Sequence, residues 1–124
     1  MRKILLTGFE AYGHTPHNPA ESVARTLDGK RIRGSEIIAR IVPNNFFECI
    51  DFVWTSIAEI EPDIVVMMGE YGGRANITVE RIAQNLNDLT RYGLADNKGV
   101  SLQGGMTVPD GPAAYYSTLP IRAM

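Results

Sequence analysis

"KILLTGF", residues Lys3–Phe9, is a nearly continuous apolar run that reaches a glycine and then an aromatic ring. Runs of this kind are typical of a strand buried on both faces of a parallel sheet. Two further stretches repeat the pattern, "SEIIARIV" at Ser35–Val42 and "DIVVMMG" at Asp63–Gly69. The sequence therefore predicts three buried strands.

The residues between the predicted strands have the periodicity of helices. Asn18 followed by Pro19 marks the start of the first helix, because Asn caps a first turn and Pro tolerates the first helical position. This helix should end near Gly29. Its expected inward-facing residues are Val23, Ala24 and Leu27. The second helix precedes Pro62 and has apolar residues at helical spacing. These are Phe46, Ile50, Val53, Trp54, Ile57 and Ile60.

Strands that alternate with helices through short links predict an open α/β sheet. We expect residues 1–124 to form a single domain. In such sheets a ligand lies beyond the carboxyl ends of the strands. The candidate loops are therefore those that follow Phe9, Val42 and Met68.

The second half of the chain has a different pattern. "NITVERIAQNLND", Asn76–Asp88, alternates like an extended strand or ribbon, and a helix over Val79–Leu86 is the less favoured alternative. The following residues are rich in Gly, Asp, Asn and Pro, which predicts a long hairpin or excursion from the sheet. The last residues resemble the first turn of a helix, with Ser117 or Thr118 near its cap and Pro120 at its start.

Composition excludes several classes of protein. The 124 residues are 44% apolar and 21% charged, with a net charge of −2, which lacks the basic excess of a nucleic-acid binder. No apolar run approaches the roughly 20 residues of a membrane helix. The single cysteine, Cys49, excludes an internal disulfide and fits a reducing cytoplasm.

Glu80 is the first chemical candidate, because it is a carboxylate within a partly apolar extended segment. Such a charge must be paired, hydrogen-bonded or protonated. One interpretation is a surface or ion-paired residue with Arg74 or Arg81 as its partner. The other is a carboxylate that orients a catalytic histidine or acts as a base. The pattern alone leaves both open.

The remaining candidates carry weaker signals. Cys49 falls on the apolar side of the second predicted helix, which favours a small core residue over a reactive thiol. His14 and His17 share one loop near Glu10, but no third histidine completes a metal set. They are expected at a pocket rim or in solvent. The turn in "MMGEYGGRAN", Met67–Asn76, lacks nucleotide-binding motifs, so its glycines more plausibly let backbone amides approach a small polar ligand.

Several stretches together resemble one known family. They are "LLTGFEAYG" (Leu5–Gly13), "NPAE" (Asn18–Glu21), "PDIVVMMGEYGGRANITVERIAQNLND" (Pro62–Asp88), "ADNKG" (Ala95–Gly99) and "DGPAAYYSTLPIRAM" (Asp110–Met124). In this order they are similar to pyroglutamyl-peptidase I, also called pyrrolidone-carboxylate peptidase. The resemblance extends over essentially all 124 residues.

This resemblance implies a three-layer α/β/α sandwich with a mostly parallel open sheet. It further implies a cytoplasmic, oligomeric cysteine peptidase that needs no cofactor and removes N-terminal pyroglutamate from peptides. The family has a Cys-His-Glu triad, and its glutamate corresponds to Glu80. A half-buried Glu80 would orient the imidazole and stabilise the imidazolium.

The same resemblance assigns the substrate pocket. Phe9 and Tyr12 would lie against the pyroglutamyl ring, and Asn18 would hold their loop. Asn44 and the turn at Glu70 would face the lactam. Leu94 would close the pocket, and Arg91 would help to stabilise the oxyanion. This chain has Tyr12, Asn44 and Glu70 where the family commonly has Phe, Thr and Gln.

The family nucleophile and triad histidine have no counterpart here, because Cys49, His14 and His17 do not match their motifs. The resemblance therefore implies an amino-terminal portion, truncated at its carboxyl-terminal side and inactive alone. The alternative is a non-catalytic homologue that acts as a binding or self-associating module.

Overall fold

The computed structural model describes residues 1–13 and 15–124, except for the side chain of Arg91. These residues form two compact units. Unit 1 comprises Met1–Glu70 and Asp96–Val100, and unit 2 comprises Tyr71–Ala95 and Ser101–Met124. The assignment of all 124 residues to one domain stays a prediction.

Unit 1 contains a four-stranded sheet in the order β2-β3-β1-β4. Its strands are β1 (Arg2–Phe9), β2 (Arg31–Ile32), β3 (Ser35–Val42) and β4 (Ile64–Met68). β1 pairs in parallel with both β3 and β4, whereas β2 pairs antiparallel with β3. The three predicted strands are present, but β4 is only partly buried.

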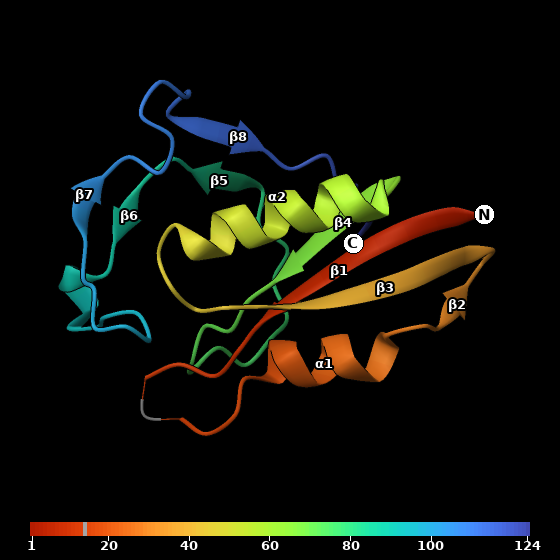
Figure 1. Cartoon of the computed structure of the whole chain (residues 1–124), viewed down its shortest axis with the longest axis horizontal. Coiled ribbons are helices and arrows are strands. Elements are labelled where there is room, and N and C mark those ends of the chain that lie inside the picture. The colour runs from red at the N-terminus through yellow and green to blue at the C-terminus, as the bar shows by residue number, and fades with distance from the viewer. Residues whose placement is uncertain (14) are drawn as a thin grey trace. The chain divides into compact units, whose positions relative to one another are not determined.

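Two helices cover opposite faces of this sheet, α1 (Pro19–Leu27) and α2 (Glu48–Ile60) (Figure 1). The unit is thus a three-layer α/β/α arrangement with a mostly parallel sheet, as expected. Its core lies on both faces of the central strands, where Leu5, Leu6, Ile37 and Val42 are buried.

α1 begins where the sequence predicts, because the Asn18 side chain accepts a hydrogen bond from the Ala20 backbone N–H at 3.0 Å. Ala20 and Ala24 are buried, but Val23 is 43% exposed. The expectation that Val23 points inward is therefore wrong. Two alanines four residues apart let α1 lie close to β1, and this leaves Val23 on the flank of the helix.

The short strand β2 was not predicted from the sequence. It forms a hairpin with β3 through Arg33 and Gly34, both of which have positive φ, 47° and 78°. Positive φ at two successive turn residues matches the twist of the strands that they connect.

The prediction that the third strand is buried is wrong for Met67 of β4, which is 68% exposed. Trp54, one of the apolar residues at helical spacing, is also 67% exposed. Among the described residues β4 is an edge strand of the sheet, so its side chains lack neighbours on one side. Phe46, expected within the helix, precedes the first residue of α2.

Unit 2 consists of two short antiparallel pairs of strands. β5 (Ile82–Gln84) pairs with β8 (Ala114–Tyr116), and β6 (Asn87–Asp88) pairs with β7 (Gln103–Gly105). The long excursion predicted for this half is confirmed, but only part of Asn76–Asp88 is strand. Single 3₁₀ turns occur at η1 (Thr90–Tyr92) and η2 (Ile121–Ala123).

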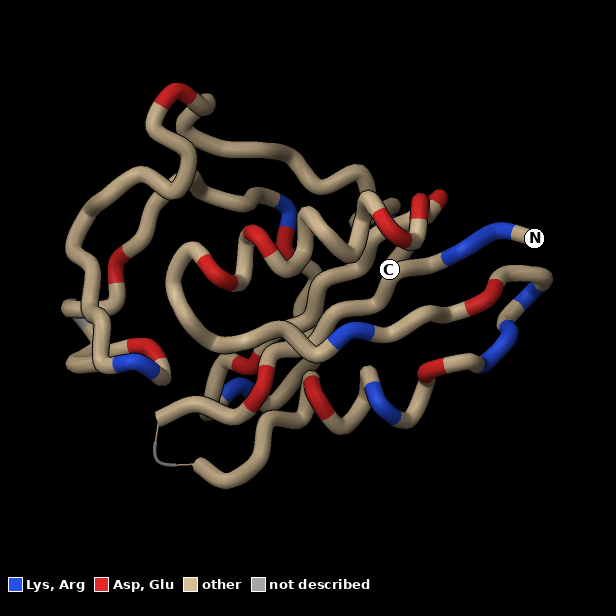
Figure 2. The backbone as a smooth tube through the Cα atoms, in the orientation of Figure 1, with Lys and Arg blue, Asp and Glu red and all other residues tan. Residues whose placement is uncertain are grey.

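Charged residues of both signs are interspersed along the backbone (Figure 2). Within the described residues, no helix has the length and apolar character needed to cross a membrane.

Candidate functional site

The candidate site of unit 1 is at the carboxyl edge of the sheet. Because β1, β3 and β4 are parallel, their carboxyl ends lie at the same edge, where Phe9 is in register with Val42 and Gly8 with Met68. The Glu10 backbone N–H continues the ladder by donating to Val42 O at 3.0 Å. The structure therefore brings together the three loops that the sequence singled out.

Tyr12 connects the first of these loops to the start of the third. Its hydroxyl lies 3.4 Å from the backbone oxygen of Glu70, to which it donates a hydrogen bond. Burial raises the pKa of Tyr12, and the Glu70 carboxylate raises it further. The Oε2 atom of Glu70 is buried with no hydrogen-bond partner among the described residues. Glu70 Oε2 is thus free to accept a hydrogen bond from a donor group of a ligand.

Asn18 fixes the other end of the first loop. This residue is only 2% exposed. Its Oδ1 caps α1, while its Nδ2 donates to the backbone oxygen of Glu10 at 3.2 Å. One buried amide therefore holds the start of the helix and the start of the loop together.

Glu10, Asn44 and Asn97 form a polar cluster that the sequence did not reveal. The Oε1 atom of Glu10 accepts from the Asn44 backbone N–H at 2.9 Å and from Asn97 Nδ2 at 3.1 Å. Asn97 Nδ2 also donates to Ala11 O at 2.9 Å, and the Asn97 backbone N–H donates to Asn44 O at 3.0 Å. The only sequence signal for Asn97 was its place within "ADNKG".

The segment Asp96–Val100 is anchored in unit 1 by its own acidic residue. Asp96 Oδ2 accepts from the Phe46 backbone N–H at 2.9 Å, and Oδ1 accepts from the backbone N–H groups of Lys98 and Val100, each at 2.9 Å. Burial raises the pKa of Asp96, but these three hydrogen bonds and Lys98 outweigh it and lower the pKa. The Lys98 ammonium also pairs with the Glu48 carboxylate.

Glu80 lies in unit 2, and its environment differs from the expected half-buried one. Its side chain is 75% exposed and pairs with Arg74, with 3.3 Å between Oε1 and Nη1. The expectation that the Glu80 side chain is half-buried is therefore wrong. The side chain is exposed because Glu80 precedes β5 and lies outside the paired strands. The ion pair with Arg74 matches the first of the two interpretations of this residue.

Arg74 organises the turn that carries Glu80. Its Nη1 donates to Thr78 Oγ1 at 2.7 Å, and its guanidinium lies 4.4 Å from the centroid of the Tyr71 ring. The carboxylate therefore sits in a short turn held by one arginine, and an exposed ion pair of this kind contributes little stability.

Arg91 and Leu94 also belong to unit 2. Arg91 is in the 3₁₀ turn η1, and Leu94 follows that turn, where its backbone N–H donates to Leu89 O at 3.3 Å. Leu94 is 37% exposed, whereas the Arg91 side chain lies outside the described part of the chain.

The histidines and the cysteine add no site. His17 is exposed and His14 lies outside the described residues. Burial raises the pKa of the Cys49 thiol, which disfavours the reactive thiolate. The described residues contain no group of three or more metal-binding side chains.

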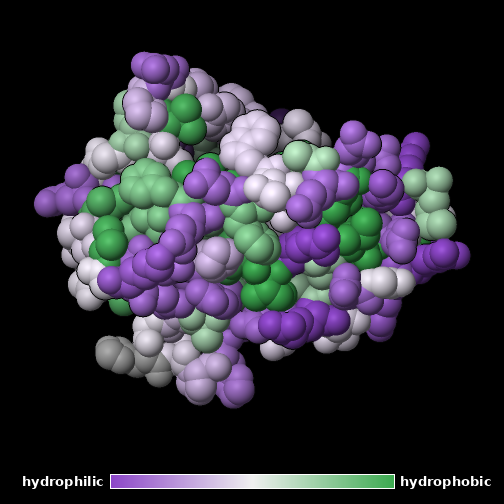
Figure 3. Space-filling model, in the orientation of Figure 1, coloured by the Kyte–Doolittle hydropathy of each residue, from purple (hydrophilic) through white to green (hydrophobic). Residues whose placement is uncertain are grey.

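Two grooves flank α2 in unit 1. The first, about 340 Å³, is almost wholly apolar and is formed by α2 together with residues of β1, β3 and β4. Its lining includes Phe9, Cys49, Val53, Trp54 and Met67. Apolar side chains reach the surface at several points on the face shown in Figure 3.

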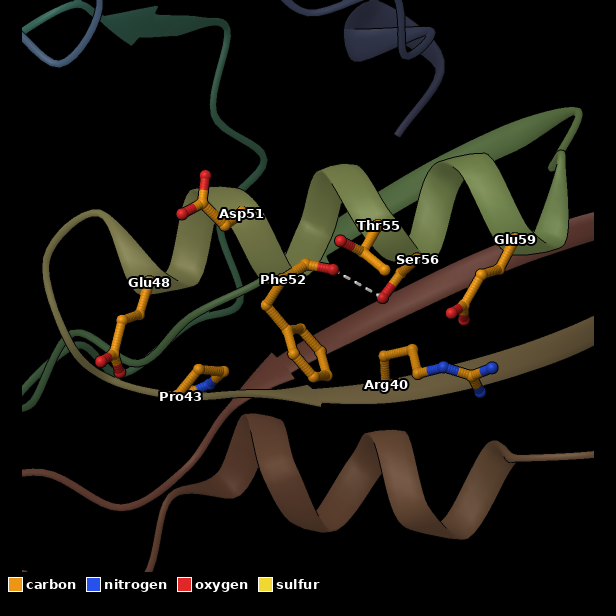
Figure 4. A pocket seen from close by; sticks show the side chains of 8 residues that line it. All are labelled: Arg40, Pro43, Glu48, Asp51, Phe52, Thr55, Ser56 and Glu59. Carbon is orange, nitrogen blue, oxygen red and sulfur yellow. Dashed lines mark hydrogen bonds between the residues drawn. The ribbon is translucent and has the colours of Figure 1, made fainter.

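The second groove, about 450 Å³, lies between α2 and the end of β3. Phe52 points from α2 toward β3, with Glu48 and Glu59 at the two ends of the groove (Figure 4). Arg40 and Asp51 also line it, and Asp51 points away from β3. None of the predicted site residues lines it.

Comparison with known proteins identifies the class as a peptidase. A sequence model of the family described as pyroglutamyl peptidase matches residues 2–124. The pyrrolidone-carboxylate peptidase of Mycobacterium tuberculosis is 58% identical over 124 residues, which are 100% of this chain and 56% of that protein. The chain therefore belongs to the pyroglutamyl peptidase family.

Solved structures agree with this assignment. Pyrrolidone carboxyl peptidase from Pyrococcus furiosus superposes with a TM-score of 0.92 at 38% identity, covering 98% of this chain and 57% of that chain. Pyroglutamyl peptidase I from Bacillus amyloliquefaciens gives a TM-score of 0.93 at 34% identity, covering 99% and 58%. The chain thus spans a little more than half the length of these relatives.

Proposed function

We propose that this chain carries the pyroglutamyl-binding loops and the triad glutamate of a thiol-dependent omega peptidase. The substrates are peptides with an N-terminal pyroglutamate, and the reaction of the complete catalytic set is hydrolysis of the bond after that residue. The observation that supports this most is the joining of the loops after β1, β3 and β4 at one edge of the sheet. Family membership supports the substrate class.

In this proposal the lactam ring lies against Phe9 and Tyr12, because flat apolar rings suit a flat, uncharged group. Asn18 holds their loop, and Asn44 and Glu70 face the polar edge of the lactam. The unpartnered Oε2 of Glu70 can accept a hydrogen bond from the lactam N–H. Leu94 closes the pocket and Arg91 stabilises the oxyanion.

Glu80 is proposed as the acidic member of the triad. An acid in this role orients an imidazole and stabilises its protonated form. Its partner in this structure is the Arg74 guanidinium, in an exposed ion pair. To bind a histidine, the Glu80 carboxylate must therefore give up Arg74 and pair with the imidazolium instead. Such an exchange costs little, because exposed ion pairs contribute about 0–1 kcal/mol.

Catalysis is not proposed for these 124 residues alone. A triad without its nucleophile retains at most a small residual acceleration, and the raised pKa of Cys49 argues against its substitution for that nucleophile. A purified sample incubated with a chromogenic pyroglutamyl amide should release no chromophore above background. Release that persists in Glu80→Ala and disappears in Cys49→Ala would overturn both assignments.

A second candidate function is self-association. The apolar groove beside α2 exposes Trp54 and Met67, and β4 is an edge strand, features that invite a second polypeptide. Sedimentation should show a species heavier than the monomer, and Trp54→Glu should shift it to the monomer. A monomeric parent chain would contradict this candidate. A cytoplasmic location is also proposed, because the single free cysteine, Cys49, is compatible with a reducing compartment.

A further inference from the structure

The loops of the proposed pocket are held by one carboxylate and one amide that are distant in the sequence. Glu10 and Asn97 are 87 residues apart, yet their side chains lie 3.1 Å apart. We propose that Glu10 and Asn97 are positioning residues, and that their clasp holds Phe9, Tyr12 and Asn44 in the arrangement that binds pyroglutamate. This inference rests on the proposed function and adds two residues to it.

The hydrogen bonds of the clasp satisfy one another. A carboxylate oxygen has two acceptor positions, and Oε1 of Glu10 fills both with the Asn44 N–H and Asn97 Nδ2. An amide nitrogen has two donor hydrogens, and Nδ2 of Asn97 gives one to Glu10 and one to Ala11 O. The clasp therefore joins the loop after β1 directly to the loop after β3.

Neighbouring contacts keep the clasp in place. The Asn97 backbone N–H donates to Asn44 O at 3.0 Å, and Asp96 accepts from the Phe46 N–H at 2.9 Å. Four hydrogen bonds thus bring the Asp96–Val100 segment to the two loops. Asn18 reaches the same loop from the other side, through Glu10 O.

The position of the clasp indicates that it affects the affinity for the ligand more than the stability of the fold. It lies beyond the ends of β1 and β3, where the loops have no ladder partners after the hydrogen bond from Glu10 N–H to Val42 O. If the loops occupy the binding arrangement for only a fraction of the time, the apparent dissociation constant rises by the inverse of that fraction. A clasp that raises this fraction lowers the dissociation constant without touching the ligand.

The test measures binding by the 124-residue chain with ¹⁵N-edited NMR titrations. The ligand is L-pyroglutamamide, and L-prolinamide, which lacks the lactam carbonyl, is the comparison. Glu10→Ala and Asn97→Ala should each raise the dissociation constant about tenfold, as expected if the binding arrangement falls to about a tenth of its population. Glu10→Gln keeps the Oε1 acceptor and should restore nearly the parent affinity. Glu59→Ala and Asn76→Ala, both at exposed positions, are the matched controls.

A second readout follows amide hydrogen exchange at Asn44. Exchange should accelerate in Glu10→Ala but not in Glu10→Gln or Glu59→Ala, because only the first removes the acceptor of that N–H. If Glu10→Ala does not fold, Asn97→Ala and Glu10→Gln decide the matter, since Asn97→Ala leaves its backbone hydrogen bond to Asn44 intact.

The outcomes separate the clasp from the proposed function. A parent chain that binds pyroglutamamide, with Glu10→Ala and Asn97→Ala equally tight, overturns the clasp and leaves the proposed function standing. A Glu10→Gln variant as weak as Glu10→Ala also overturns it. A parent chain that fails to prefer pyroglutamamide to prolinamide overturns the proposed function. The exchange rate at Asn44 then decides whether Glu10 holds the loop at all.

Discussion

Replacement of Gly8 by Ala should destabilise unit 1 strongly, because no space exists for the added methyl group. Gly8 lies in β1 beneath the first turn of α1. A Cβ atom at this position would lie 2.3 Å from Ala20 O and 2.7 Å from Ala20 C. Both are backbone atoms of a helix whose Ala20 and Ala24 are buried against the sheet. Relief therefore requires α1 to move as a body.

The cost follows from two opposing terms. Overpacking that shifts the backbone typically lowers the free energy of unfolding by about 1–3 kcal/mol. A clash with the backbone of a rigid helix should lower it by about 3 kcal/mol or more. Replacing Gly by Ala also restricts the unfolded chain, which returns about 0.4–1 kcal/mol. The expected net loss in the free energy of unfolding is about 2–3 kcal/mol.

Urea denaturation followed by circular dichroism measures this loss. With a slope of about 1–3 kcal/mol per molar urea for a small protein, the midpoint should fall by about 1 M or more. Gly69→Ala is the matched control, since no atom lies within 4 Å of its added Cβ and its φ is not positive. Equal midpoints for Gly8→Ala and Gly69→Ala would refute the close approach of α1 to β1.

Further predictions concern the contacts around the loops. Asn18→Ala should lower the free energy of unfolding by about 2 kcal/mol, the sum of a lost cap and an unpartnered Glu10 carbonyl, whereas urea denaturation of Asn18→Asp should show most of the cap retained. The Glu48–Lys98 pair lowers the pKa of Glu48 and raises that of Lys98, mainly through their hydrogen bond. Its contribution should therefore be lost as pH falls through the lowered Glu48 pKa or rises through the raised Lys98 pKa. The melting temperatures of Lys98→Ala and the parent should differ at neutral pH and low salt. They should converge in 1 M salt, because the screening length falls to about 3 Å. A difference in melting temperature that persists in 1 M salt would argue against an ionic origin. Cys49 should react with iodoacetamide more slowly than free cysteine at pH 8, because burial raises its pKa; mass spectrometry over time would show equal rates if the thiol were fully open to solvent.

The strands of unit 1 were predictable because their pattern reports burial directly. Runs such as Lys3–Phe9 are typical of strands that are covered on both faces, and the two helices provide that cover for β1. The Asn18–Pro19 signal worked for a related reason, since capping depends on neighbours within one turn. Side-chain exposure was less predictable: Val23, Trp54 and Met67 are apolar by composition, but their burial depends on which elements pack against them.

The residues of the candidate site likewise include some that the sequence could predict and some that it could not. The loops after Phe9, Val42 and Met68 could be assigned to one edge because parallel strands end together, whereas the roles of Tyr12, Asn18 and Asn44 came from the family resemblance. The clasp of Glu10 and Asn97 could not be predicted, since 87 residues separate them and no periodicity relates them. Glu80 was identified as a charge that needs a partner, but its exposure was not predicted, because the alternating segment Asn76–Asp88 forms paired strand only from Ile82 onward.

The proposal to be tested is that this chain recognises a pyroglutamyl group without cleaving the bond after it. A pyroglutamyl dipeptide amide labelled with ¹³C at the lactam carbonyl, followed by NMR in the presence of the chain, tests both parts in one sample. We predict that the lactam resonance shifts and broadens in proportion to the chain added, and that the dipeptide remains intact. An unperturbed resonance, or free pyroglutamate whose release depends on Cys49, would contradict the account.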